Sequence, residues 1–267
     1  MKRMRVLGLC LLAVGAISAV MAASASAVAS PEFGRCKAQA GGKFSNSGCT
    51  LLAKEVSKQK FEWFGGPGPK NKFKGAQKAE TLATLETTGG TKITCTAEKN
   101  ENAEFNSGKT VAKIVAEFTG CESSKIPCNS AGEPSGHITT NPLAGKLGVE
   151  KLGLKEGVVV ESKNKLEVQL FAELGGALAK FSCSALAVEV TGCVAHPISS
   201  GKMLLTSTEK FTASKGEQKP DKFLGGPADE CALSSEVGSG PEESGQTITA
   251  IVTGEEKLEA NPLPQGE

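Results

Sequence analysis

The chain has 267 residues, and its 30 basic and 29 acidic side chains give a formal net charge of +1. Arg35 is the only arginine after residue 27, whereas proteins that read nucleic acid rely on arginine for phosphate and guanine. Eleven phenylalanines, a single tryptophan and no tyrosine also disfavour a sugar-binding groove, which normally uses flat amphipathic rings. The composition therefore argues against a nucleic-acid partner and against a lectin or polysaccharide hydrolase.

The first 27 residues have the pattern of a secretory signal peptide. Basic residues at positions 2, 3 and 5 precede an apolar run over 6–21, and small residues follow. We expect cleavage after Ala25 or Ala27, which also removes Cys10 and leaves eight cysteines and no membrane span. The predicted location is secreted or extracellular.

The rest of the chain is expected to be mainly β-strand. Apolar and polar residues alternate in 91–98, 113–119, 166–174, 186–190 and 247–253, and less regularly in 81–86, 103–106, 137–140, 158–161 and 203–212. Glycine, proline and asparagine separate these runs. A helix is expected only over 51–60. Many short strands at such spacing predict an all-β fold, an antiparallel β-sandwich or jelly roll stapled by disulfides.

The expected organisation has four parts. The signal peptide (1–27) precedes an N-terminal cystine loop with a Gly/Pro-rich segment (28–70). The β-sandwich body covers 71–254, and a loose, polar C-terminal tail covers 255–267.

An even number of cysteines in an exported chain predicts disulfides, although eight thiols allow 105 pairings. Cys183 and Cys193 bracket an alternating run, and an extended segment of that length separates them by roughly 30 Å, against the 7 Å that a disulfide allows. Segments that can reverse direction separate Cys36 from Cys49 and Cys121 from Cys128, and Cys95 and Cys183 fall on inward faces of strands. We therefore expect the pairs Cys36–Cys49, Cys121–Cys128 and Cys95–Cys183, with Cys193–Cys231 as the remaining pair. A zinc or redox site is disfavoured because no two cysteines stand at the short spacing of such sites.

Catalytic candidates are few. A Ser-His-Asp triad would need His137 or His196 near Asp221 or Asp229, and the chain has no G-x-S-x-G turn. We expect no catalytic, cofactor-binding or metal-binding residue.

Paired glutamates could serve a glycosidase. Glu167, Glu173 and Glu189 fall on outward positions of alternating runs, so we expect them in solvent.

Two segments could contact a partner. Phe61, Trp63 and Phe64 form the densest aromatic cluster, just before a Gly/Pro-rich stretch. Such a cluster more often plugs a core under a loop, but it is the first place to look for a partner contact. Residues 123–126, inside the expected Cys121–Cys128 ring, could form the exposed loop of a protease inhibitor.

Several stretches resemble a group of secreted actinobacterial proteins that contain cysteines, are rich in β-structure and have no assigned function. The resemblance lies in residues 31–36, 47–49, 61–63, 85–95, 118–121 and 139–143. It implies an exported β-rich protein and supplies no catalytic residues. Cys193 and Cys231 fall outside the pattern, as an additional local bridge would.

The expected function is a secreted binding or structural module of the cell envelope or extracellular medium, with a partner that the sequence does not identify. Two alternatives stay open: a secreted hydrolase with a His/Glu site, and an inhibitor or effector that uses the 121–128 loop.

Overall fold

The structure is a computed structural model that describes residues 31–155, 158–159, 164–199, 201–219, 231–238 and 240–261. The predicted signal peptide, Asp221, Asp229 and the end of the C-terminal tail lie outside these residues. The described chain is almost entirely antiparallel β-structure, which confirms the predicted fold class.

The described strands and one 3-10 turn follow one another along the chain. They are β1 (Glu32–Ala38), η1 (Val56–Lys58), β2 (Phe61–Gly65), β3 (Lys72–Gln77), β4 (Ala83–Thr87), β5 (Lys92–Cys95), β6 (Ala97–Phe105), β7 (Thr110–Ile114), β8 (Glu117–Thr119), β9 (Glu122–Ser123), β10 (Ile126–Asn129), β11 (Ile138–Thr139), β12 (Leu143–Lys151), β13 (Leu154–Lys155), β14 (Val158–Val159), β15 (Lys165–Ala172), β16 (Ala179–Cys183), β17 (Leu186–Ile198), β18 (Leu204–Ser214), β19 (Glu217–Lys219), β20 (Leu233–Val237) and β21 (Pro241–Asn261).

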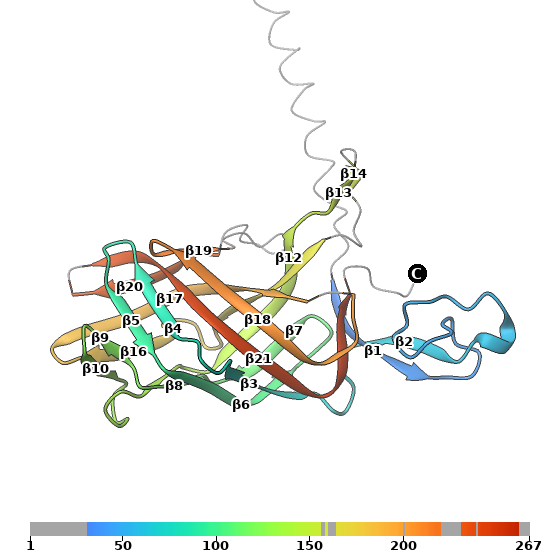
Figure 1. Ribbon diagram of the computed structural model, residues 1–267, viewed down its shortest axis with the longest axis horizontal. Helices are drawn as coiled ribbons and strands as arrows, with labels where there is room; N and C mark the ends of the chain where they lie inside the picture. Colours follow the sequence, from blue (N-terminus) through green and yellow to red (C-terminus); the bar gives the residue numbers. More distant parts are fainter. Residues whose placement is uncertain are drawn as a thin grey trace, which may run out of the picture.

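One end of the body is a closed ring of strands. Starting from β9, each strand pairs with the next in the order β10, β16, the first half of β17, β20, the first part of β21, β4 and β5, and β5 pairs with β9 again. These strands lie at the left of Figure 1. Closure leaves no free edge in this ring, so its backbone donors and acceptors are satisfied by neighbouring strands.

The other end is a second ring that the pairings do not close. From the second half of β17 the order runs through β15, β12, β7, β6, β3 and the middle of β21 to β18. No backbone pairing between the described strands joins β18 to β17. They meet instead through side chains of His196 on β17 and Glu209 and Phe211 on β18, which we call the β17–β18 seam.

The two rings share one interior because β17 and β21 pass from the first into the second. A single apolar cluster, with members such as Ile93, Phe181, Val111 and Val168, extends through both rings. The expected two-layer sandwich is not confirmed, because all strands except β13 and β14 belong to one connected network. Alternation shows that one face of a strand is buried, but not whether the sheet packs on another sheet or curls onto itself.

Residues 31–66 form a small N-terminal unit that projects from one end of the body (Figure 1). β1 and β2 pair, and Phe44, Cys49 and Trp63 make a separate small core. The prediction of a helix over 51–60 is wrong: only the short 3-10 turn η1 forms, and none of its residues is buried. Leu52 and Val56 stay exposed, and a short helix is not stable without tertiary packing of its apolar face.

The C-terminal segment is not loose up to residue 261. Glu259, Ala260 and Asn261 pair with the start of β1, and all three are buried. The polar composition of the segment concealed this pairing, since a strand can be held by main-chain hydrogen bonds to a neighbour that is distant in sequence.

All eight cysteines after residue 27 form disulfides, but two of the four predicted pairs are wrong. Cys36–Cys49 and Cys193–Cys231 are confirmed. The other two bridges are Cys95–Cys121 and Cys128–Cys183, with Cα separations of 4.0 and 4.1 Å. The reason is the order of strands in the closed ring: Cys128 on β10 lies opposite Cys183 on β16, and β5, which carries Cys95, pairs with β9 just after Cys121.

Candidate ligand-binding cavity

The interior of the two rings contains a cavity of about 270 Å³. Its wall is chiefly apolar and draws on nearly every strand. Aromatic side chains contribute much of it, with Phe33 and Phe73 both packed against Phe105 at centroid distances of 4.9 and 4.8 Å. Inward-facing aliphatic residues complete it, among them Leu85, Ile93, Val168, Val190, Ile248 and Ala250.

The cavity reaches the surface near the turn between β17 and β18. Its lining continues to Ser199, Lys202 and Leu205, all of which are exposed. The opening therefore lies beside the β17–β18 seam, where the wall is closed by side chains rather than by backbone pairing.

Charged and titratable groups interrupt the apolar wall: Glu98 on β6, Glu209 on β18 and Glu259 on β21 are buried, and His196 on β17 is partly buried. The sequence analysis did not single out Glu98 or Glu209. Strict alternation over 91–98 predicts Ala97 on the same inward face as Ile93 and Cys95, but Ala97 is exposed and Glu98 is 7% exposed. The alternation slips by one residue at Thr96, between β5 and β6, and such a slip exchanges the two faces of a strand.

The carboxyl of Glu98 is only half satisfied by the protein. Asn100 Nδ2 donates a hydrogen bond to Glu98 Oε1 at 3.3 Å, while Asn100 Oδ1 accepts one from the backbone N–H of Gly75 at 3.0 Å. Glu98 Oε2 is buried and has no hydrogen-bond partner. Burial raises the pKa of Glu98, and the hydrogen bond from Asn100 opposes this only in part.

His196 and Glu209 face each other across the seam, with Nε2 3.5 Å from Oε2. The imidazole also stacks on the ring of Phe211 at a centroid distance of 4.2 Å. This is the His/Glu pair that a hydrolase would need, inside a concave site. Ser199 and Ser207 line the same cavity, but no serine is hydrogen-bonded to His196 in the described part of the chain.

His137 and the loop predicted for an inhibitor lie elsewhere. His137 is half-buried in the turn before β11, where its backbone carbonyl accepts a hydrogen bond from Ser130 N–H. Residues 123–126 form a tight hairpin between β9 and β10, with Ser124 and Lys125 at positive φ. Cys121 and Cys128 are not bonded to each other, so the disulfide ring on which the inhibitor hypothesis depended does not exist.

The glutamates proposed for a glycosidase do not converge on the cavity. Glu173 is exposed, and Glu189 is partly exposed and paired with Lys180. The expectation for Glu167 is wrong: it is fully buried, on the face of β15 opposite to Leu166 and Val168. Alternation placed Glu167 correctly on the face of β15 opposite to the cavity, but it does not show that this outer face is buried as well.

The three aromatic residues predicted as a partner contact differ in their exposure. Trp63 is buried in the N-terminal unit, Phe61 is partly buried, and only Phe64 reaches the surface, with the Arg35 guanidinium 5.9 Å from its ring. These three residues do not form one exposed apolar patch.

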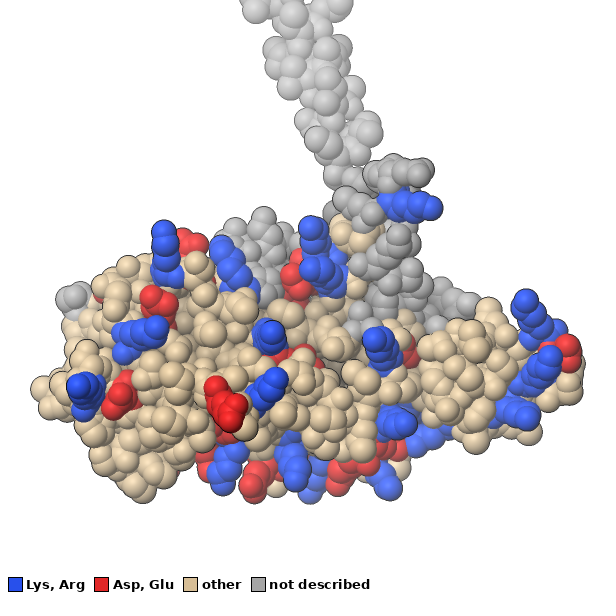
Figure 2. All heavy atoms as spheres, viewed as in Figure 1, with Lys and Arg blue, Asp and Glu red and all other residues tan. Residues whose placement is uncertain are grey.

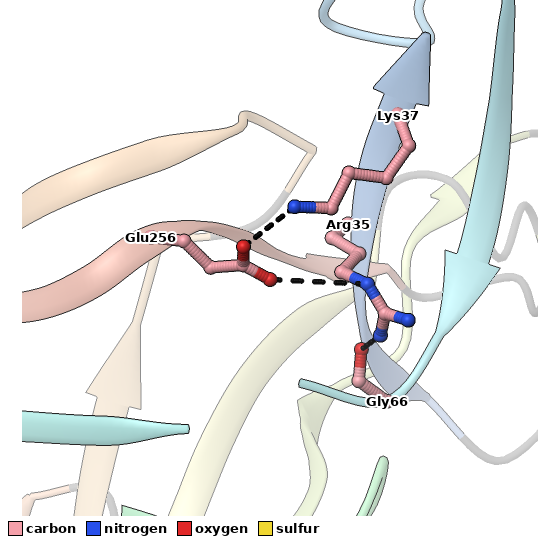
Figure 3. A network of polar contacts seen from close by, with 4 residues as sticks. All are labelled: Arg35, Lys37, Gly66 and Glu256. Carbon is pink, nitrogen blue, oxygen red and sulfur yellow. Dashed lines mark hydrogen bonds and ion pairs between the residues drawn. The ribbon is translucent and has the colours of Figure 1, made fainter. Parts of the chain in front are cut away.

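A charged cluster ties the N-terminal unit to the body beside the cavity (Figure 3). Glu256 on β21 lines the cavity and receives Lys37 Nζ at 2.5 Å and Arg35 Nε at 3.8 Å, both from β1. Arg35 Nη1 also donates to the carbonyl oxygen of Gly66 at 2.8 Å. Elsewhere on the face shown in Figure 2, acidic and basic side chains are interspersed.

No protein-family model, no curated protein and no solved structure matches the chain. In the described residues, no three histidine, cysteine or acidic side chains are grouped so that they could hold a metal ion. No helix in the same part of the chain has the length and apolar character to span a membrane.

Proposed function

We propose that this protein is an extracellular binding module that takes up a small, mainly apolar molecule in the cavity enclosed by its strands. The observation that carries the proposal is the cavity itself: about 270 Å³, walled by apolar and aromatic side chains, with a few buried polar groups. An engineered apolar cavity of about 150 Å³ already binds benzene, so a larger ligand fits here. Transfer of an apolar molecule from water into such a wall is favourable without any specific chemistry.

The extracellular setting is supported by the four disulfides together with the signal-like N-terminus. Crosslinks among the strands of a ring preserve the shape of its interior without a protein partner. The cell envelope or the surrounding medium is the setting in which a carrier of this kind would meet its ligand.

The proposal is tested by calorimetric titration of the oxidised protein with 1-decanol, comparing two substitutions on β21. Ala250 is buried and lines the cavity, whereas the next residue, Ile251, is partly exposed and is not part of the lining. Ala250→Phe should fill the site and weaken binding by about tenfold or more, which corresponds to about 1.4 kcal/mol. Ile251→Phe should leave binding unchanged. Absence of saturable binding to the wild type, or equal binding to both variants, would refute the proposal.

A second candidate is hydrolysis of a small ester in the same cavity, favoured by the approach of His196 to Glu209. In this case His196 would act as general base towards a water molecule, with Glu209 orienting the imidazole. Turnover of p-nitrophenyl butyrate that His196→Ala abolishes would support this activity. A wild-type rate no higher than that of the variant would exclude it for this ester.

A further inference from the structure

The carboxylates that line the cavity differ in how their charge is compensated. Glu209 faces His196, and Glu256 receives both Arg35 and Lys37. In the described part of the chain, Glu98 and Glu256 are the cavity-lining glutamates that have a buried oxygen without a hydrogen-bond partner. Glu256 is paired with two basic side chains, whereas no basic side chain in the described residues is paired with Glu98.

The neighbouring charges do not reach Glu98. Lys99, the next residue on β6, is exposed and pairs with Glu117 on β8 at 3.1 Å, on the outer face of the sheet. The residue opposite Glu98 in the β6–β8 pairing is Phe118, which also lines the cavity. Glu98 therefore places a buried oxygen acceptor next to an aromatic residue of the cavity wall.

A buried carboxylate is costly unless it is protonated or matched by a cation with hydrogen-bond donors. Asn100 holds Glu98 Oε1 and leaves Oε2 for a group that enters the cavity. An ammonium group meets both needs, because it supplies positive charge and three donors. Nearby aromatic faces such as Phe118 would add a favourable cation–π contribution.

We propose that the ligand is a cationic amphiphile, a primary amine with an unbranched apolar chain, whose ammonium binds Glu98 Oε2 while its chain occupies the apolar cavity. This inference rests on the proposed function and specifies the ligand class. The acidic lining selects against a fatty acid of the same length, because its carboxylate would meet Glu98 with like charge.

The test compares decylamine hydrochloride, 1-decanol and sodium decanoate by calorimetric titration at pH 7, below the micelle concentrations of the two salts and the solubility limit of decanol. The wild type should bind decylamine at least about tenfold more tightly than decanol, and decanoate most weakly. This comparison needs no substituted protein, so it does not depend on whether a variant folds.

Glu98→Gln keeps the shape of the side chain and removes its charge. It should weaken decylamine binding by about tenfold and change decanol binding by less than about twofold. Glu117→Gln, on the adjacent strand but exposed, is the matched control for attraction to surface acids and should alter neither.

The two levels of the hypothesis fail differently. Equal affinities of the wild type for decylamine and decanol, or an unchanged decylamine affinity in Glu98→Gln, would overturn the ammonium site and leave the apolar binding site standing. If none of the three compounds binds, the proposed function itself is wrong.

Discussion

Glu98 is an acidic residue in an apolar interior, and it should cost the fold stability at neutral pH. Its pKa is raised in the folded protein, so between the ordinary glutamate pKa of 4.5 and the folded pKa the native state binds more protons than the unfolded state. Stability is then highest below the unfolded pKa and falls as pH rises through the folded pKa. Burial raises the pKa of Glu259 as well, which adds a contribution of the same sign.

We therefore expect the free energy of unfolding of Glu98→Gln to exceed that of the wild type by about 1 kcal/mol at pH 7. At pH 4 it should equal the wild-type value or lie below it. The measurement is urea unfolding at a series of pH values between 4 and 8. Glu173→Gln, on an exposed side chain, should reproduce the wild-type profile. A Glu98→Gln curve parallel to the wild type across the series would show that this carboxyl does not titrate in the range.

At the scale of elements, β1 connects two parts of the molecule. Its end pairs with β2 in the N-terminal unit, and its start pairs with the end of β21 in the body. Glu256 strengthens this connection, because it is largely buried and interacts with two basic residues of β1 (Figure 3).

Glu256→Gln should loosen the N-terminal unit from the body and lower the free energy of unfolding by about 1 kcal/mol. Hydrogen exchange of the amides in β1 should become faster, while exchange in the closed ring stays the same. Glu55→Gln is a matched control, because the Glu55–Lys58 pair is highly exposed and contributes little. Unchanged exchange in β1 would mean that backbone pairing alone holds the unit in place.

The sequence analysis located the strands in which apolar and polar residues alternate over a long run. The runs 166–174 and 247–253 correspond to parts of β15 and β21. β1, β3 and β12 escaped notice because glycines interrupt their patterns, and β21 was cut short because its last residues are polar. Close approach explains one such glycine: a Cβ at Gly34 on β1 would overlap the ring of Trp63.

At the scale of the whole molecule, one disulfide crosslinks the N-terminal unit and the other three crosslink segments of the body. Cys36–Cys49 spans 13 residues and Cys128–Cys183 spans 55. In the loop-entropy model these are worth about 3 and about 4 kcal/mol. Trp63 is the only tryptophan and packs near Cys36 and Cys49, with Met203 of the body at the edge of the same cluster, so its fluorescence reports chiefly on that unit.

Replacing Cys36 and Cys49 together by alanine should shift the Trp63 fluorescence transition to lower denaturant while the far-ultraviolet circular dichroism transition stays near that of the wild type. Replacing Cys128 and Cys183 should shift the dichroism transition instead, because that bridge joins adjacent strands of the closed ring. The same displacement of both signals in the Cys36/Cys49 variant would show that the two parts unfold as one unit.

The sequence by itself determined that the chain is built of strands and that its cysteines pair, because alternation and an even thiol count are local or compositional properties. Cys36–Cys49, which spans 13 residues, was predictable from such local features, whereas Cys193–Cys231, which spans 38, followed as the remaining pair. Only the tertiary structure decided the ring closure, the pairing of Cys95 with Cys121 and Cys128 with Cys183, and the cavity with Glu98 in its wall. Each of these depends on which strands become neighbours, and backbone pairing between distant segments leaves no mark in the pattern of either segment alone.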